Sequence, residues 1–194
     1  MAETLLGLLR HGQTDWNVEG LLQGVSDIPL NQVGLAQAKA AAAILQPHDW
    51  DVVLASPLSR AIETARAFTS MNDLSDPIIE PLLTERAFGA AEGWTYLQWR
   101  AAHDRHEVIE GAETLEALER RAALLLENII QKHGGKRVLA VSHGAMIRSL
   151  VRIVTNHQLP KDGDRFGNTS LTKIAHADDE WTLLHFDGRP LVEI

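Results

Sequence analysis

The stretch Leu8-Leu9-Arg10-His11-Gly12-Gln13-Thr14-Asp15-Trp16-Asn17 places an arginine, a histidine and a glycine at the end of an apolar run. Residues 4–9 form a short apolar segment that polar residues end, a pattern typical of a buried strand. In α/β proteins, ligand sites are usually built where strands end. The stretch therefore indicates that reactive side chains follow the first strand.

Length and composition narrow the classes of protein that this chain can belong to. Its 194 residues fit one domain over 1–194, and the absence of cysteine excludes disulfides, thiolate nucleophiles and zinc–thiolate sites. The net charge of −8 (18 Lys and Arg against 26 Asp and Glu) argues against nucleic acid or an anionic membrane as partner, but not against a small anionic substrate. Without a membrane-spanning or leader segment, we expect a cytoplasmic protein, with a homodimer as the default assembly.

The order of expected elements predicts the fold class. Apolar runs indicate strands over 4–9, 51–55, 78–83, 138–141, 170–175 and 181–186. Helices are expected over 32–45, 57–69, 114–132 and 145–154, with a loop over 12–31 and an irregular stretch over 85–93. Ser56 and Pro57 have the pattern of an N-cap and a first helical residue. This alternation predicts an α/β fold, a three-layer α/β/α sandwich with a mostly parallel central sheet.

Reactive side chains follow three of the expected strands. Arg10 and His11 follow the first, Arg60 lies in the first turn of the helix after the second, and His143 follows the strand over 138–141. Parallel strands end at one edge of a sheet, so we expect these four side chains to converge, together with the N-terminus of the helix near Pro57. Each residue alone has a structural explanation, a hydrogen-bonded core histidine or a solvated arginine. As a set they predict a phosphate pocket.

Four motifs carry a family resemblance. They are Arg10-His11-Gly12 with Thr14 and Asn17, then Ser56-Pro57-Leu58-Ser59-Arg60-Ala61, then Leu83-Thr84-Glu85-Arg86-Ala87-Phe88-Gly89-Ala90-Ala91-Glu92-Gly93, and Ser142-His143-Gly144. In this order they resemble the histidine phosphatase superfamily, which includes the cofactor-dependent phosphoglycerate mutases. The resemblance covers essentially the whole chain and implies a phosphoglycerate mutase-like fold.

The resemblance implies a two-step mechanism. His11 would attack phosphorus and form a phosphohistidine, while Glu85 would protonate the leaving oxygen and then take a proton from the attacking water. Arg10, Arg60 and His143 would hold the phosphoryl oxygens in the transition state. The resemblance implies that neither a metal nor another cofactor is needed. It also implies a small phosphorylated metabolite as the partner.

Further residues are expected to bind substrate. Asn17 would donate a hydrogen bond to the phosphoryl group, Gln23 and Gly24 lie where the family's first loop approaches the pocket, and Gly144 follows His143. Selectivity is expected to reside in the first loop and in residues 94–112. A sugar phosphate or a phosphoglycerate derivative is the expected kind of substrate.

The proposed roles set physical requirements. One ring nitrogen of His11 must be unprotonated, which positive neighbours favour, and a backbone carbonyl on the other nitrogen would fix the tautomer. Glu85 must carry a proton near neutral pH, which calls for partial burial or a nearby carboxylate. Glu92 is expected at a structural turn rather than as that carboxylate.

Several alternatives stay open beside a metal-independent, histidine acid phosphatase-like phosphomonoester hydrolase. The nearest is mutase-type phosphotransfer, although the mutase branch has an insertion after the Glu85 motif for which this chain has little room. A metal-dependent hydrolase and a non-catalytic phospho-ligand binder are the others. His103 and His106, with Asp104 and Glu107, resemble metal ligands, but a charge-dense segment of this kind favours a solvated helix face or a lid.

Overall fold

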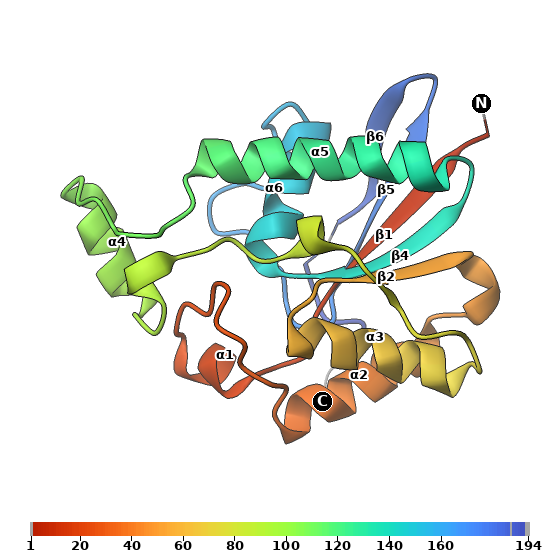
Figure 1. Ribbon diagram of the computed structural model, residues 1–194, viewed down its shortest axis with the longest axis horizontal. Helices are drawn as coiled ribbons and strands as arrows, with labels where there is room; N and C mark the ends of the chain where they lie inside the picture. Colours follow the sequence, from red (N-terminus) through yellow and green to blue (C-terminus); the bar gives the residue numbers. More distant parts are fainter. Residues whose placement is uncertain (1, 187, 193–194) are drawn as a thin grey trace.

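A computed structural model of the chain, which describes residues 2–186 and 188–192, is built around one sheet. The sheet has 6 strands in the order β3-β2-β4-β1-β5-β6 (Figure 1). Their bounds are β1 (Thr4–Arg10), β2 (Val52–Ala55), β3 (Ile78–Ile79), β4 (Arg137–Ser142), β5 (Leu171–Ala177) and β6 (Glu180–His185). Strands β1 to β4 pair in parallel, and β5 and β6 add antiparallel pairs at one side. The expectation of a mostly parallel sheet is confirmed.

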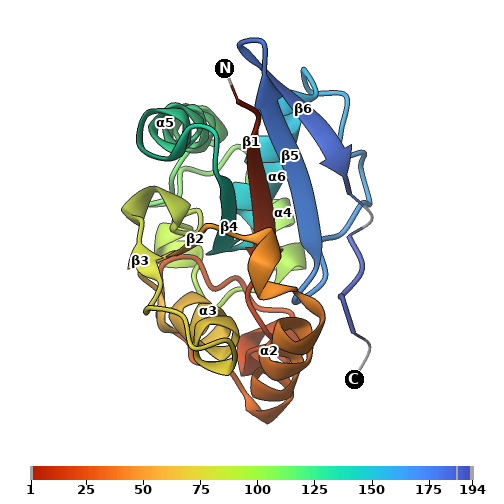
Figure 2. The ribbon, with the colours of Figure 1, turned by 90° about the vertical axis from the view of Figure 1, so that its right-hand side faces the viewer.

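Helices cover both faces of the sheet. The helices are α1 (Asp15–Glu19), α2 (Gln32–Ile44), α3 (Ser59–Met71), α4 (Tyr96–Asp104), α5 (Leu115–His133) and α6 (Gly144–Val154), with short 3₁₀ turns η1 (Pro47–Asp49), η2 (Pro81–Leu83) and η3 (Gly89–Ala91). Helices α2 and α3 lie on one face and α5 and α6 on the other (Figures 1 and 2). The predicted α/β/α sandwich is therefore confirmed. No helix in the described part of the chain has the length and apolarity to cross a bilayer.

The alternation of side chains along the central strands builds the two cores. Leu6 and Leu8 of β1 are buried against α5 and α6, whereas Leu9 is buried against α2 and α3. In β4, residues 138 and 140 join the first core and residues 139 and 141 join the second. Each fully buried leucine contributes on the order of 1.5–3 kcal/mol. Because both faces are buried, these strands are continuous apolar runs.

The pairing of β1, β4 and β2 brings their carboxyl ends to one edge of the sheet. The backbone N–H of His11 donates to the carbonyl of Ser142 at 3.0 Å, and that of Ser56 donates to Val141 at 3.0 Å. The residues that follow the three strands are therefore neighbours. Helices α1 and α4 lie near this same end of the molecule (Figure 1).

Two local expectations are corrected. The loop over 12–31 contains the short helix α1, because Thr14 and Asn17 form a reciprocal capping box in which each side chain accepts from the other's backbone N–H. The extended stretch over 78–83 forms a strand only at residues 78–79 and then turns into η2 at Pro81. Proline lacks the N–H that would continue a strand ladder, which explains the change.

The start of α3 also differs from the expectation. The helix begins at Ser59 after an N-cap at Leu58 whose side chain makes no cap hydrogen bond, so Ser56 is not the N-cap. The first helical N–H and the hydroxyl of Ser59 both donate to Asp27 Oδ1, at 2.8 Å each. The expected free N–H at this terminus therefore has a protein carboxylate as its acceptor. Arg60 lies in the first turn, as predicted.

A close backbone approach fixes the loop after β1 against α2. An ideal Cβ on Gly34 of α2 would lie 2.0 Å from the Gln13 carbonyl oxygen, and one on Gly12 would lie 2.5 Å from the Gly34 carbonyl oxygen. Both neighbours are backbone atoms, which cannot swing aside as a side chain would. Glycine at both positions lets the loop that carries His11 pack directly on the helix.

We expect Gly34→Ala to destabilise the protein by about 1–3 kcal/mol, as overpacking typically does, even though alanine is the better helix former by about 1 kcal/mol. Urea unfolding followed by circular dichroism measures the change. Ala43→Gly, at an exposed position of the same helix, is the matched control and isolates the helix-propensity difference. A Gly34→Ala protein more stable than the parent would contradict the packing argument.

Candidate active site

His11 is buried directly after β1, with its ring orientation set by its own backbone neighbour. The side chain is 2 % exposed, and Nδ1 lies 2.7 Å from the Gly12 carbonyl oxygen. A carbonyl only accepts, so Nδ1 carries the proton and Nε2 keeps the lone pair. Burial, and then the charges of Arg10 and Arg60, hold the pKa of His11 well below the usual histidine value. The expected carbonyl contact and the effect of positive neighbours are both present.

His143 packs beside His11 at the end of β4. The ring centroids are 5.1 Å apart, and His143 Nε2 lies 2.7 Å from Ser56 Oγ. The Ser56 hydroxyl oxygen also accepts from Leu58 N–H at 3.4 Å, so Ser56 links the His143 ring to the start of the segment that leads into α3. Burial, followed by the proximity of His11 and the arginines, lowers the pKa of His143 well below its usual value. Both imidazoles are therefore neutral at neutral pH.

Arg10 and Arg60 supply the positive charge at this edge. Arg60 has an exposed fraction of 0 %, and its Nη1 and Nη2 donate to the carbonyls of Ser26 and Gly24 at 2.8 Å each. Arg10 Nη1 donates to the Phe166 carbonyl. Burial lowers the pKa of both guanidinium groups, which remain charged near neutral pH. The Nε atoms of both arginines and Nδ1 of His143 are buried without a hydrogen-bond partner among the described residues.

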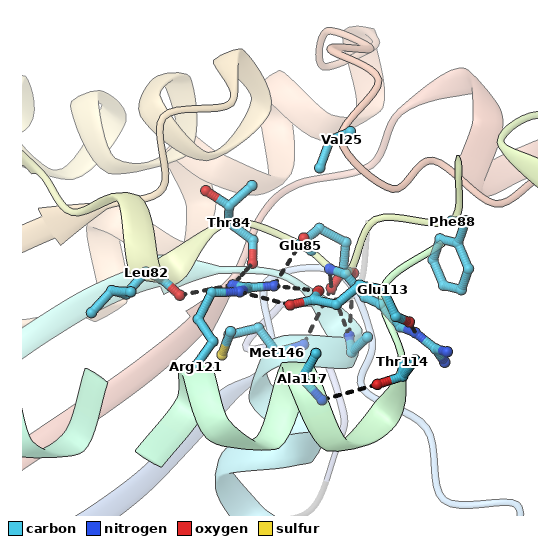
Figure 3. A network of polar contacts seen from close by, with 12 residues as sticks. Val25, Leu82, Thr84, Glu85, Phe88, Glu113, Thr114, Ala117, Arg121 and Met146 are labelled. Atoms are coloured by element: carbon cyan, nitrogen blue, oxygen red, sulfur yellow. Dashed lines mark hydrogen bonds and ion pairs between the residues drawn. The ribbon is translucent and has the colours of Figure 1, made fainter. Parts of the chain in front are cut away.

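Glu85 lies at the N-terminus of α6, where backbone N–H groups hold its carboxylate (Figure 3). Oε1 accepts from the N–H groups of Arg86, Ala145 and Met146 at 2.9, 3.1 and 3.2 Å. Oε2 accepts only from Ala145, at 3.2 Å, so it is the oxygen with remaining hydrogen-bonding capacity among the described contacts. Glu85 is partly buried, as expected, but among the described residues the groups that contact its carboxyl are backbone N–H donors and not a second carboxylate.

Gly144 lies between the positive side of the site and Glu85. An ideal Cβ on Gly144 would be 3.7 Å from Arg10 Nε and 4.0 Å from Glu85 Oε2. A guanidinium donor and a carboxylate oxygen therefore face the same small volume. The five residues predicted from four separate motifs come together at one edge of the sheet.

The Asn17 side chain is tied to the His11 loop. Its Oδ1 accepts from Thr14 N–H and from Asn168 Nδ2, both at 3.1 Å. Asn168 Nδ2 also donates to the His11 carbonyl at 3.0 Å. With Oδ1 engaged twice, the amide NH₂ of Asn17 is the group left for a further acceptor.

Gln23 and Gly24 have structural partners in the first loop. Gln23 is 8 % exposed, and its Oε1 accepts from the Thr14 hydroxyl at 3.0 Å. Gly24 has φ +53°, its carbonyl holds Arg60, and a Cβ there would lie 2.1 Å from Glu92 Oε1. The role of Gln23, Gly24 and Gly144 in binding substrate stays a prediction.

Glu92 has the structural role that the sequence favoured. Its carboxylate accepts from the N–H groups of Val25 at 3.0 Å, Ser26 at 2.9 Å and Phe88 at 3.2 Å. It therefore ties the first loop to the segment that carries Glu85. Because several donors engage it, Glu92 acts here as a loop anchor.

The charged segment around α4 stays outside this cluster. His103, Asp104, His106 and Glu107 are all exposed. Over residues 2–186 and 188–192, no group of three or more histidine and carboxylate side chains is arranged to hold a metal ion. The placement agrees with the expectation of a solvated helix face.

Several residues of the site were not found from the sequence. Ser56 looked like a helix cap but orients His143. Asn168 bridges Asn17 and His11, and it lies outside the motifs that predicted the site. Arg121 of α5, paired with Glu113, contacts the main chain of the Glu85 segment (Figure 3). A signal for Arg121 existed: it lies three residues after Leu118 and four before Leu125, beside the buried stripe of α5.

Comparisons with known proteins identify the family of this chain. Residues 6–187 match the sequence profile of the histidine phosphatase superfamily (branch 1). The chain is 34 % identical over 185 residues to an uncharacterized phosphatase, PhoE, of Bacillus subtilis, which covers 95 % of this chain and 94 % of that protein. It is 31 % identical over 195 residues to a metal-independent phosphoserine phosphatase of Arabidopsis thaliana, with 93 % and 79 % covered.

A solved structure shares the fold. Phosphoserine phosphatase of Entamoeba histolytica, in complex with 3-phosphoglyceric acid, superposes with a TM-score of 0.80 at 26 % identity, covering 95 % of this chain and 96 % of that one. The profile match spans nearly the whole chain and includes all four motifs. This protein belongs to the histidine phosphatase superfamily.

Proposed function

We propose that this protein is a metal-independent phosphomonoesterase that works through a phosphohistidine on His11 and acts on a small phosphorylated metabolite such as a sugar phosphate or a phosphoglycerate derivative. In the first step, the Nε2 lone pair of His11 attacks phosphorus and the bond from phosphorus to the ester oxygen breaks. Protonated Glu85 gives its proton to the departing oxygen, so that a neutral alcohol leaves.

The second step returns the enzyme to its starting state. A water attacks the phosphohistidine, the Glu85 carboxylate takes a proton from that water, and the phosphorus–nitrogen bond breaks. Inorganic phosphate leaves, His11 regains its neutral form and Glu85 carries a proton again. The same carboxyl thus serves as acid and then as base, with Oε2 as the reacting oxygen.

The observation that carries this proposal is the set of buried donors around His11. Buried polar groups in proteins almost always have a partner, yet Arg10 Nε, Arg60 Nε and His143 Nδ1 have none among the described residues. The oxygens of a tetrahedral phosphoryl group are acceptors that would satisfy the two arginine Nε–H donors and would favour the His143 tautomer with its proton on Nδ1. Their charge would complement the two guanidinium groups. The lone pair of His11 Nε2 belongs to the same cluster.

Hydrolysis, rather than transfer to a second alcohol, is supported by the segment after the Glu85 motif. Between Gly93 and Leu115 the chain forms only the short helix α4 and a loop. Apart from the buried Ala102, α4 is partly or fully exposed. Two of the relatives are named phosphoserine phosphatases, which supports a small phosphorylated substrate.

Replacing His11 with alanine is expected to reduce p-nitrophenyl phosphate turnover at least about 1,000-fold, because loss of a nucleophile removes the covalent step. Assays run in chelator test metal dependence at the same time. His48→Ala, at a site whose side chain is 77 % exposed, is the matched control and should keep parental activity. Turnover that survives His11→Ala would exclude His11 as nucleophile, and loss of parental activity in chelator would favour a metal-dependent hydrolase.

Replacing Glu85 with glutamine should slow phenyl phosphate far more than p-nitrophenyl phosphate, because phenol is the poorer leaving group and needs the proton more. General acid catalysis is typically worth about 10²–10⁴-fold, which sets the loss in kcat/KM expected for phenyl phosphate. Glu63→Gln, on the exposed side of α3, is the control. Equal losses on both substrates would contradict the general acid role.

Titration should find His11 and His143 neutral at pH 6, since burial lowers both pKa values well below 6.5. Nitrogen chemical shifts of the imidazole rings measure this and should report a proton on Nδ1 of His11. Because the unfolded chain takes up these protons first, the free energy of unfolding should fall as pH drops below about 6.5. A His11 that titrates at or above the usual histidine value would contradict the electrostatic argument.

A further inference from the structure

Glu85 lies in a part of the chain that regular secondary structure does not hold. Residues 84–87 belong to no helix or strand. General acid catalysis nevertheless requires that the carboxyl oxygen lie within hydrogen-bond reach of the departing oxygen. The N–H groups of α6 orient the carboxylate, but they do not fix the backbone from which the side chain extends. Another part of the molecule must therefore fix the main chain at Glu85.

Arg121 of α5 contacts this main chain with the nitrogens of one guanidinium group (Figure 3). Nη1 donates to the carbonyls of Leu82 at 3.0 Å and Thr84 at 2.6 Å, and Nη2 donates to the carbonyl of Glu85 at 3.3 Å. The same guanidinium donates from Nε and Nη2 to Glu113, at 3.0 and 2.7 Å. All five N–H donors of the arginine are thus engaged.

Glu113 completes the contact from the other side of Glu85. Its backbone N–H donates to the Ala87 carbonyl at 2.9 Å, and its carbonyl accepts from Arg86 Nε at 2.8 Å. The Arg121 and Glu113 side chains are only 19 % and 17 % exposed, so the pair forms a partly buried, charge-neutral unit. The backbone is held before, at and after Glu85.

We propose that Arg121, locked in place by Glu113, is the positioning residue for Glu85, fixing the backbone so that the carboxyl reaches the leaving oxygen. This inference rests on the proposed function of Glu85 as general acid. Arg121 contacts Glu85 through its carbonyl and not through its carboxylate, so this contact fixes the position of the residue rather than the orientation of its carboxyl group. A planar fork with five donors suits this role, and a lysine ammonium cannot reproduce it.

The test compares kcat/KM on phenyl phosphate and p-nitrophenyl phosphate, because this ratio reports the step in which the leaving group departs. Arg121→Met should lower kcat/KM about 10–100-fold on phenyl phosphate and less than about threefold on p-nitrophenyl phosphate, part of the range that general acid catalysis supplies. Equal losses on the two substrates would overturn the proposal.

Arg152→Met is the matched control. Arg152 also forms an arginine–glutamate pair between α5 and α6, donating from Nε to Glu119 at 3.0 Å, but within the described part of the chain it makes no hydrogen bond to the Glu85 segment. Its kcat/KM should stay within about twofold of the parent on both substrates. A leaving-group preference in Arg152→Met as large as that in Arg121→Met would assign the effect to general destabilisation and overturn the proposal.

The double variant Arg121→Met/Glu85→Gln separates positioning from other effects. If Arg121 acts through Glu85, the double variant should have a kcat/KM on phenyl phosphate less than about threefold below that of Glu85→Gln alone. The reason is that the effects of residues that act as a unit are not additive. Fully additive losses would overturn the proposal.

Arg121→Lys keeps the inference testable should the methionine variant fail to fold. Lysine retains the charge but offers a single ammonium, so a smaller loss with the same leaving-group preference is expected, and equal losses on the two substrates would overturn the proposal. The Glu85→Gln protein identifies which idea is wrong. If Glu85→Gln loses more kcat/KM on phenyl phosphate than on p-nitrophenyl phosphate and the Arg121 variants do not, only the positioning role is wrong. If Glu85→Gln loses equally on both substrates, the general acid role is wrong, and the positioning role that rests on it is wrong as well.

Discussion

Strand β4 hydrogen-bonds to β1 along one side and to β2 along the other, and the site depends on this pairing. At the end of this ladder, the His11 N–H donates to the Ser142 carbonyl and the Ser56 N–H donates to the Val141 carbonyl. The ends of the three strands are therefore direct neighbours. The contact between His143 and Ser56 follows from that alignment, and so does the proximity of the two histidine rings. A slip of one residue in either pairing would turn the side chains of the strand to the opposite face.

Burial and the charges of Arg10 and Arg60 keep the two histidines at this edge of the sheet uncharged. Two buried guanidinium groups are expensive to place close together, and two protonated imidazoles beside them would raise that cost further. The lowered pKa values of His11 and His143 leave both rings neutral. Backbone carbonyls, from the first loop for Arg60 and from Phe166 for Arg10, take part of the hydrogen-bonding capacity of the cations. The Nε atoms of both arginines remain without a hydrogen-bond partner among the described residues, and we propose that phosphoryl oxygens bind them.

The amino-acid sequence was informative where long apolar runs ended in polar residues. His11, Arg60 and His143 could be brought together from the expected strand order alone, because parallel strands end at one edge. Ser56 was misassigned since the Ser-Pro pattern is a strong local helix signal, whereas its partner His143 lies 87 residues away. Arg121 was missed for a similar reason, because nothing local distinguishes it from Arg120 except its position beside the buried stripe of α5. The roles of Ser56 and Arg121 both depend on contacts with residues of other helices, strands or loops, which a local sequence pattern does not contain.

The Glu92 carboxylate joins two parts of the site that serve different tasks. Through Val25 and Ser26 it holds the loop whose carbonyls grip Arg60, and it belongs to the same irregular segment as Glu85. The residues that we propose for anion binding and for proton transfer are therefore held by the same carboxylate. We therefore expect substitutions in the first loop and substitutions around Glu92 to be non-additive, so that a change tolerated in one background is harmful in another.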